Sequence, residues 1–430
     1  MKVCIQGGTL IDPANDIHSR MDVLIEDGFI RDIQPAIAPK DDCEIIDAKG
    51  KLVLPGLVDM HCHLREPGFE YKETIFTGTR AAARGGFTSI VCMANTSPVA
   101  DNAAVLSFIS QKAKKEGVVR VYPVGAVTKG LKGEELSEMG ELKEAGAIAL
   151  SDDGKPIMNA NLMRLAMEYA SNFNLLVISH CEDTQLSDEG VMNEGYVSTL
   201  LGLKGSTRAA EEVMIARDII LADMLSTRIH IAHVSTRGGV ELIRHAKKRG
   251  IEVTAETAPH YFTATDTWVE GYDANAKVNP PLRTQYDIEA IKEGLRDGTI
   301  DCIATDHAPH HLDDKQVEFH LAASGISGFE TAFSLAYTQL VASGILTIDE
   351  LVVKMSQKPC EILGIPGGCL HVGSAADIVV VDPNTEWVID REAFLSKGKN
   401  TPFHGKTVIG KVCHTLVGGK AVIRNGMLTV

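Results

Sequence analysis

Residues 57–65 read Leu-Val-Asp-Met-His-Cys-His-Leu-Arg, an apolar run that ends in two histidines and an arginine. Further short runs of apolar and β-branched residues occur near 87–93, 119–126, 146–151, 174–179, 228–233, 251–256 and 300–305. Helical patterns lie between them, at 74–84, 103–116, 161–172, 206–225 and 238–248. A strand followed by a helix, repeated eight times over about 250 residues, predicts a parallel (β/α)8 TIM barrel. A doubly wound open sheet is the alternative, and the length of the repeat favours the barrel.

The two ends of the chain show a different pattern, of short strands and tight turns. Residues 23–30 place Asp27-Gly28 between apolar runs, which favours a type I′ hairpin turn. Residues 376–381 form a β-branched run, and residues 416–423 read as a second hairpin around Gly418-Gly419. We therefore expect both termini to meet in one small β-sandwich domain, made of residues 1–55 and 370–430, beside a barrel of residues 56–369.

Composition excludes several classes of protein. Lys and Arg number 42 against 57 Asp and Glu, a formal net charge of −15. This argues against broad contact with nucleic acid or an anionic membrane surface, because both need a basic face. No run of about 18 apolar residues occurs, so we expect no membrane span. The first residues lack a signal-peptide pattern. The nine cysteines are scattered and never spaced Cys-x-x-Cys, which predicts a reduced, cytoplasmic protein.

Polar residues follow nearly every predicted strand. In a barrel the carboxyl ends of all strands point to one rim, where active sites form. We therefore expect residues that are far apart in sequence to become neighbours at this rim. In chain order they are His61, His63, Asn95, Asp153, His180, His233 and Asp306.

His61 and His63 are two residues apart, so a strand places both side chains on the same face, with Arg65 continuing that face if the strand persists. Two imidazoles in a barrel core are costly unless they bind something, and a divalent metal suits them. A lone His180 or His233 would more simply be a core histidine. Their shared position at strand ends, together with the His-x-His pair and Asp306, predicts a metal centre instead.

Asp153 is a candidate bridge between two metal ions, since two neighbouring cations need a shared anion. Its surroundings, Asp152-Asp153-Gly154, also suit a turn or a helix cap. His230 lies three residues before His233, so we expect it to face the opposite side of its strand and to be structural.

Several segments together resemble the cyclic amidohydrolases of the amidohydrolase superfamily, and among them the class I bacterial dihydroorotase family. The most specific are residues 277–283, Lys-Val-Asn-Pro-Pro-Leu-Arg, and residues 304–310, Ala-Thr-Asp-His-Ala-Pro-His. The resemblance covers essentially the whole chain, and its other segments are residues 61–68, 95–96, 151–154, 180–183 and 256–260.

The resemblance implies a zinc enzyme that reversibly hydrolyses the cyclic amide of dihydroorotate to N-carbamoyl-L-aspartate in de novo pyrimidine (UMP) biosynthesis. It implies two Zn²⁺ ions: His61, His63 and Asp306 hold one, His180 and His233 hold the other, and Asp153 bridges them. Many relatives, hydantoinases among them, bridge their metals with a carboxylated lysine on strand four. Residues 147–151 contain no lysine and Lys155 lies beyond the strand, so the class I pattern with Asp153 fits.

For the chemistry, zinc lowers the pKa of a bound water to about 7. We expect Asp306 to act as the general base that accepts a proton from this water and returns it to the ring nitrogen. The substrate carboxylate needs a cation, and Arg65 suits it, although a surface ion pair is the alternative for Arg65. Asn279 suits the pyrimidine ring, although it also fits a turn before prolines. The full set expected to contact substrate is His63, Arg65, Asn95, Asn279, His310, Ser324 and Gly325, the last two in a loop (309–325) that resembles the family's mobile active-site loop.

Two alternative functions remain. An allantoinase or hydantoinase shares the His-x-His start and the barrel, but the missing strand-four lysine weighs against it. A catalytically silent chain that only scaffolds aspartate transcarbamoylase should have lost metal ligands, whereas this sequence keeps all six. A homodimer and a complex with aspartate transcarbamoylase are expectations from the family.

Overall fold

The computed structural model describes residues 2–38 and 42–429, and its centre is a ring of short parallel strands. Hydrogen-bonded ladders join the first three strands and the last five. Parallel bridges between Gly125 and Leu150 and between Cys62 and His307 link the two ladders into a closed ring. The closure confirms the predicted barrel over the open sheet. In order the strands are β6 (Leu57–Cys62), β7 (Phe87–Cys92), β8 (Arg120–Pro123), β9 (Ala149–Leu150), β10 (Leu176–Ser179), β13 (Ile229–Ile231), β14 (Val253–Thr257) and β15 (Cys302–Ile303).

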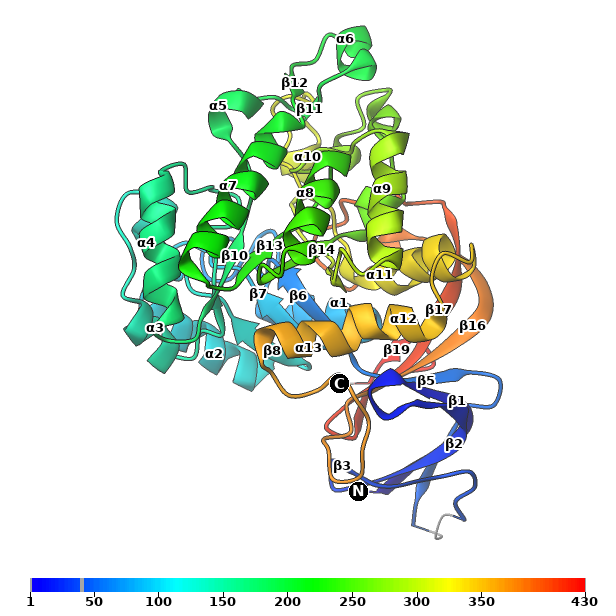
Figure 1. Cartoon of the computed structure of the whole chain (residues 1–430). Coiled ribbons are helices and arrows are strands. Elements are labelled where there is room, and N and C mark those ends of the chain that lie inside the picture. The colour runs from blue at the N-terminus through cyan, green and yellow to red at the C-terminus, as the bar shows by residue number, and fades with distance from the viewer. Residues whose placement is uncertain (1, 39–41, 430) are drawn as a thin grey trace.

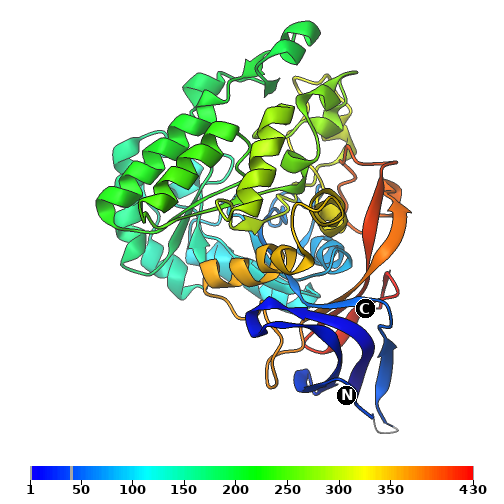
Figure 2. The ribbon, with the colours of Figure 1, turned by 45° about the vertical axis from the view of Figure 1, so that its right-hand side comes forward.

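Helices surround this ring, as Figures 1 and 2 show. Their starts are fixed by capping side chains: Thr74, Asn102 and Thr236 each accept a hydrogen bond from a backbone N–H of the first turn. The main helices are α1 (Ile75–Arg84), α2 (Ala103–Glu116), α3 (Met139–Glu144), α4 (Ala160–Ser171), α7 (Ala209–Leu225), α8 (Arg237–Lys248), α9 (Gln285–Arg296), α11 (Phe329–Ala336), α12 (Ile348–Val352) and α13 (Lys358–Leu363).

Four of the five predicted helices agree with the structure to within one residue at each end. The fifth, expected from residue 206, begins at Ala209 in α7. The reason is that Gly205–Ser206 forms strand β12, which pairs with β11 (Met192–Asn193). These two strands and α6 (Tyr196–Leu201) make an excursion at the end of the barrel opposite the terminal strands (Figure 1).

Both ends of the chain contribute to one nine-stranded sheet, in which β5 from the N-terminal part pairs antiparallel with β16. The predicted hairpin turns are confirmed: Asp27, Gly28, Gly418 and Gly419 all have positive φ angles between 50° and 88°. The strands are β1 (Lys2–Asp12), β2 (Ile17–Glu26), β3 (Phe29–Gln34), β4 (Glu44–Asp47), β5 (Leu52–Pro55), β16 (Ile378–Val388), β17 (Thr407–Val417), β18 (Lys420–Arg424) and β19 (Met427–Leu428).

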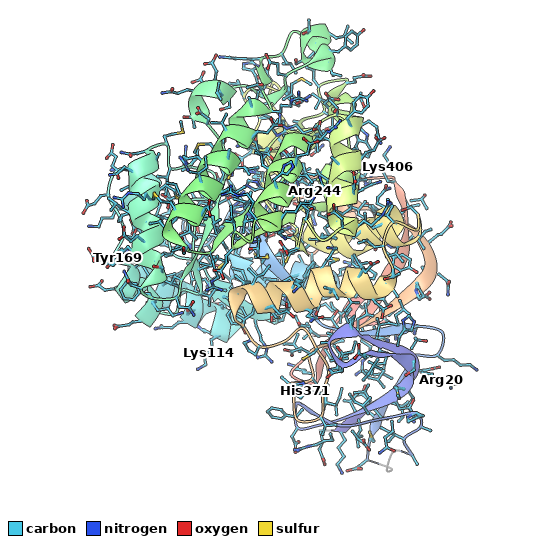
Figure 3. The ribbon with its side chains drawn as sticks, viewed as in Figure 1. Arg20, Lys114, Tyr169, Arg244, His371 and Lys406 are labelled. Carbon is cyan, nitrogen blue, oxygen red and sulfur yellow. The ribbon has the colours of Figure 1, made fainter. Side chains whose placement is uncertain are left out.

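The fold class is therefore a (β/α)8 barrel with a small β-sandwich built from both chain ends. The β part has a core of its own, in which Ile5, Val23 and Val53 pack with Ile378 and Leu416. In Figure 3 the labelled Arg20 and His371, from opposite ends of the sequence, lie on this part, whereas Tyr169 lies on an outer barrel helix.

The exact division at residues 55/56 and 369/370 stays a prediction. Its terminal ranges include residues 1, 39–41 and 430, which lie outside the described residues. Within the described ranges no helix combines the length and the apolar character needed to cross a bilayer.

Candidate active site

Six buried side chains meet at the carboxyl rim of the barrel. One lies near the end of β6 and one just beyond it, and the others follow β9, β10, β13 and β15. Two of the six, His233 (φ 35°) and Asp306 (φ 45°), have left-handed backbone conformations, which turn the chain sharply where its strand has ended. The six are His61, His63, Asp153, His180, His233 and Asp306.

Asp153 lies at the centre of this cluster. Its Oδ1 atom is 3.3 Å from Nε2 of His61, 3.6 Å from Nδ1 of His180 and 3.5 Å from Nε2 of His233. Its Oδ2 atom is 3.5 Å from Nε2 of His63. One carboxylate thus faces four imidazole nitrogens, which is the position that an anion shared between two cations requires.

Asp306 closes the other side of the cluster. Its Oδ1 atom is 3.3 Å from Nε2 of His63 and 3.7 Å from Nε2 of His61. Two sets of donor atoms lie within 4.8 Å of one another: His61 with Asp153 and His233, and His61 with His63 and Asp306. Imidazole nitrogens and carboxylate oxygens are the donors that zinc takes in catalytic sites.

Acceptors behind the histidines orient them toward the centre. Glu256 Oε1 lies 2.6 Å from Nδ1 of His61, and Asn95 Oδ1 lies 2.9 Å from Nδ1 of His63. When Nδ1–H donates to these oxygens, the lone pair of Nε2 faces the cluster. In the described part of the chain, the buried Nε2 of His61 has no hydrogen-bond partner. An unsatisfied buried nitrogen costs free energy, and a metal ion at the centre would satisfy it, so these residues fit a metal.

The opposite charges of the cluster shift one another's pKa values. Burial alone would raise the pKa of Asp153, but the charge of His61 and the hydrogen bonds from His180 and His233 lower it well below its ordinary value. Burial alone would lower the pKa of His61, but Asp153 and Glu256 raise it well above its ordinary value, so a metal ion that bound at Nε2 would displace a proton from this nitrogen. Asp306 follows the same logic: His63 and His61 lower its pKa despite burial. The carboxylates are therefore held ionised, as metal ligands must be.

Two acidic residues that the sequence analysis did not assign support this site. Glu182 Oε2 lies 3.0 Å from Nε2 of His180 and accepts a hydrogen bond from Nδ2 of Asn279 at 2.9 Å. Glu256 lies in β14 with 1% of its side chain exposed. An acidic residue within a predicted buried strand is the signal that points to Glu256. The signal for Glu182 is its place just after a predicted strand and two residues beyond His180, whereas its contact with Asn279, 97 positions away, could not be predicted.

A pocket of about 360 Å³ opens beside the cluster. Arg65 reaches into its wall, where Nη2 lies 3.3 Å from Nε2 of His310 and Nε donates to the carbonyl of Pro309. His310 Nε2 also lies 2.9 Å from the carbonyl oxygen of Ser324. All seven residues expected to contact substrate line this pocket: His63, Arg65, Asn95, Asn279, His310, Ser324 and Gly325.

His310 is a neutral group in a cationic setting. Burial, followed by the charges of Arg65, Lys72 and Lys315, lowers the pKa of His310 to about 2. Its Nε2–H therefore donates to the Ser324 carbonyl, while its Nδ1 accepts from Nζ of Lys72 at 3.2 Å. This wall of the pocket suits an anionic group of a ligand.

One expectation from strand periodicity does not apply, because its condition is not met, and another is wrong. Strand β6 ends at Cys62 and Arg65 has a φ angle of 62°, so Arg65 reaches the pocket from a turn and not from a continued strand. His230 does not turn away from the site: its Nε2 lies 3.4 Å from Glu256 Oε2, and the other oxygen of Glu256 contacts His61. Alternation failed here because β13 ends at Ile231, before His233.

Comparison with known proteins places the chain in a family. A protein named dihydroorotase from Acetivibrio thermocellus is 60% identical over 424 residues, covering 99% of each chain. Another of the same name from Pelotomaculum thermopropionicum is 58% identical over 428 residues, covering 100% of each. The chain belongs to the dihydroorotase family. The family description "Dihydro-orotase-like" matches residues 50–239 of this dihydroorotase-family chain.

Solved structures of cyclic amidohydrolases share the fold of this dihydroorotase-family chain. A dihydropyrimidinase from Brevibacillus agri has a TM-score of 0.88 at 26% identity, covering all of this chain and 96% of that one. An L-hydantoinase from Arthrobacter aurescens has a TM-score of 0.90 at 26% identity, covering all of this chain and 97% of that one. The dihydroorotase-family chain is thus a hydrolase that acts on cyclic amides.

Proposed function

We propose that the chain is a zinc-dependent dihydroorotase that interconverts dihydroorotate and N-carbamoyl-L-aspartate in de novo pyrimidine biosynthesis. The observation that carries the proposal is the meeting of Asp153 with four imidazoles beside a pocket wall that holds Arg65 and His310. The first feature suits a metal-assisted hydrolysis, and the second suits a substrate that carries a carboxylate. The full-length relatives named dihydroorotase support the choice of substrate.

The six clustered side chains are the proposed metal ligands. His61, His63 and Asp306 would hold one Zn²⁺, His180 and His233 would hold a second, and Asp153 would bridge the two. When bound, zinc supplies a water of lowered pKa and polarises the carbonyl that is attacked. Glu256, Asn95 and Glu182 keep the imidazoles turned toward the centre.

Asp306 is the proposed general base. As water adds to the amide carbon, a carboxylate oxygen of Asp306 accepts its proton. As the C–N bond breaks, the same oxygen gives the proton to the leaving ring nitrogen. The products are a ureido group and a carboxylic acid, which releases the second proton of the water to solvent and becomes a carboxylate. The lowered pKa of Asp306 in the cluster keeps its carboxylate ionised, which is the form that a general base needs.

The pocket wall orients the substrate. Arg65 would bind the substrate carboxylate through its planar guanidinium, with a hydrogen bond from Asn95 and with His310 sharing its N–H between the carboxylate and the Ser324 carbonyl. Asn279 would hydrogen-bond the pyrimidine ring, and its amide is held by Glu182. His63, Ser324 and Gly325 would complete the contacts.

The position of Asp153 favours a dihydroorotase over the hydantoinase or allantoinase alternative. Asp153 occupies the centre of the cluster, whereas Lys155, the lysine next along the chain, is exposed. No lysine of strand β9 is available to carry a bridging carboxylate, because β9 is Ala149–Leu150.

Assembly and location are part of the proposal. We expect a homodimer and allow for a complex with aspartate transcarbamoylase, with no nucleic-acid or membrane partner. A cytoplasmic location is supported by the nine cysteines, all of which are free thiols.

The proposal is tested with a substrate panel of dihydroorotate, hydantoin and allantoin, assayed with zinc present. Preferential hydrolysis of dihydroorotate, and its formation from N-carbamoyl-L-aspartate, is the expected result. Faster turnover of hydantoin or allantoin would assign the chain to the alternative, and no turnover of any substrate would favour the scaffold reading.

A further inference from the structure

Two buried lysines join the segments that carry the pocket residues. Lys277 lies two positions before Asn279, and Lys315 ends the short helix α10 (Leu312–Lys315), within the loop that contains His310 and Ser324. Their exposed fractions are 6% and 5%. The chemistry above uses neither ammonium group. Burying an ammonium is costly unless other groups replace its hydration, so each of these two side chains needs hydrogen-bond acceptors inside the protein.

Lys277 reaches into the loop. Its Nζ atom donates to the carbonyl oxygens of Phe319 and His320, each at 2.9 Å. Its own carbonyl oxygen accepts a hydrogen bond from the backbone N–H of Gly325 at 2.9 Å. Both ends of this one residue therefore hold the loop.

Lys315 reaches in the opposite direction. From the loop, its Nζ atom donates to the carbonyl oxygens of Ala274 at 2.9 Å and Lys277 at 3.2 Å. A third bond, at 2.7 Å, goes to Ala323 within the loop itself. Each lysine thus binds the backbone of the other's segment, and all five acceptors of the two ammonium groups are neutral carbonyls.

Because the acceptors are backbone carbonyls, these hydrogen bonds depend on the relative position of the two chain segments. A carboxylate partner on a flexible side chain follows the ammonium when a segment shifts, whereas a carbonyl is fixed to the path of its own chain. Bonds of this kind hold only one relative placement of residues 274–279 and 309–325. That placement puts Asn279, His310 and Ser324 around the same pocket.

We propose that Lys277 and Lys315 form a reciprocal clamp of positioning residues, which holds the loop 309–325 against the pocket and so sets the affinity for the substrate. The inference deepens the proposed function and rests on it for the identity of the substrate. It requires that loss of either lysine loosens the loop without removing a metal ligand. The effect should therefore fall on KM more than on kcat.

The test replaces each lysine with methionine, which keeps an unbranched side chain that is one atom shorter and removes the N–H donors. Lys354→Met is the matched control, because Lys354 is also buried and donates to a carbonyl, that of Ile300 at 2.9 Å, away from the pocket. Three quantities are compared: KM and kcat for dihydroorotate, bound metal, and the rate at which a glutamate-specific protease cleaves after Glu318. This glutamate is exposed and lies in the loop beside the bonds from Lys277.

We expect Lys277→Met and Lys315→Met to raise KM by about tenfold, the usual effect of losing a hydrogen bond from a charged group, with metal content unchanged. Both variants should be cleaved at Glu318 faster than Lys354→Met. The double variant should have a KM close to that of the worse single variant, because the two changes release the same junction.

Equal KM values and equal cleavage rates in the two clamp variants and the control would overturn the clamp. If a methionine variant does not fold, Lys277→Gln and Lys315→Gln keep a polar end but carry it on a shorter, uncharged side chain that withdraws the donors from these carbonyls. They are judged by the same comparison. Failure of the wild-type protein to hydrolyse dihydroorotate would refute the proposed function, whereas the protease result would still decide on the clamp.

Discussion

Glu256 lies directly behind His61, with its Oε1 atom 2.6 Å from Nδ1 of the imidazole and its other oxygen 3.4 Å from Nε2 of His230. The side chain is buried, and the charge and hydrogen bond of His61, together with the nearby imidazole of His230, lower its pKa to about 2, although burial opposes this shift. Glu256 is thus an anion that fixes which nitrogen of His61 faces the proposed metal centre.

Glu256→Gln should weaken metal binding by about 10- to 100-fold, the usual effect of removing a carboxylate that orients a metal-binding histidine. The measurement is the zinc retained after dialysis against a graded series of chelator concentrations. Glu211→Gln is the control, since Glu211 is buried but accepts its hydrogen bonds from Ser235 and Thr236. Retention equal to wild type in Glu256→Gln would remove Glu256 from this role.

Asp306→Asn tests the general base. The amide cannot accept the proton of the attacking water, so kcat should fall by at least about 10²- to 10⁴-fold, the range for general acid–base catalysis. Zinc should stay largely bound, because His61 and His63 remain. Metal analysis of the same sample makes the result interpretable, and a near wild-type rate would exclude Asp306 as the base.

Arg65→Lys tests the carboxylate site. One point charge replaces a planar fork, so KM for dihydroorotate should rise by about tenfold while metal content is unchanged. Wild-type KM and kcat in the variant would mean that Arg65 serves only its contacts with Pro309 and His310.

Glu330 predicts a pH dependence of stability away from the active site. Burial raises its pKa to about 7, although backbone N–H groups of Leu395 and Ser396 and the charge of Arg84 oppose this. The folded state therefore binds a proton that the unfolded state, with an ordinary pKa near 4.5, releases. The stabilisation is complete below the unfolded pKa and is lost as pH rises toward 7.

Unfolding by urea at pH values from 4.5 to 7 measures this dependence. Relative to Glu330→Gln, the wild-type free energy of unfolding should fall by up to about 1.4 kcal/mol per pH unit. The exposed Glu392→Gln serves as the control. Parallel curves for wild type and Glu330→Gln would show that Glu330 is ionised in the folded protein.

The sequence predicts the barrel and the meeting of the six clustered residues because both depend on local rules. Each strand is an apolar run, and each polar residue follows the end of a run, so topology alone brings them to one rim. The pairing of His61 and His63 was predicted from their two-residue spacing alone. The positive φ angles of the turn were predicted from two residues, Asp27 and Gly28.

What the sequence did not predict depends on contacts between distant segments or on where a strand stops. Glu256 and His61 are 195 positions apart, and nothing in either segment specifies the other. Lys277 and Lys315 look like ordinary surface lysines until the fold buries them. The turn that carries Arg65 was not predicted, because the sequence does not show that β6 ends at Cys62. The direction of His230 was wrong because period-two alternation was carried past the end of β13.

The most direct test of the proposed zinc dependence removes divalent ions from the protein and then returns zinc. The protein is treated with a chelator, freed of divalent ions, and assayed for dihydroorotate hydrolysis as zinc is added back in measured amounts. We expect no activity without metal and a recovery of activity that saturates at two zinc ions per chain. His61→Ala should lose this recovery. Full hydrolysis of dihydroorotate by the metal-free protein would contradict the proposed zinc dependence.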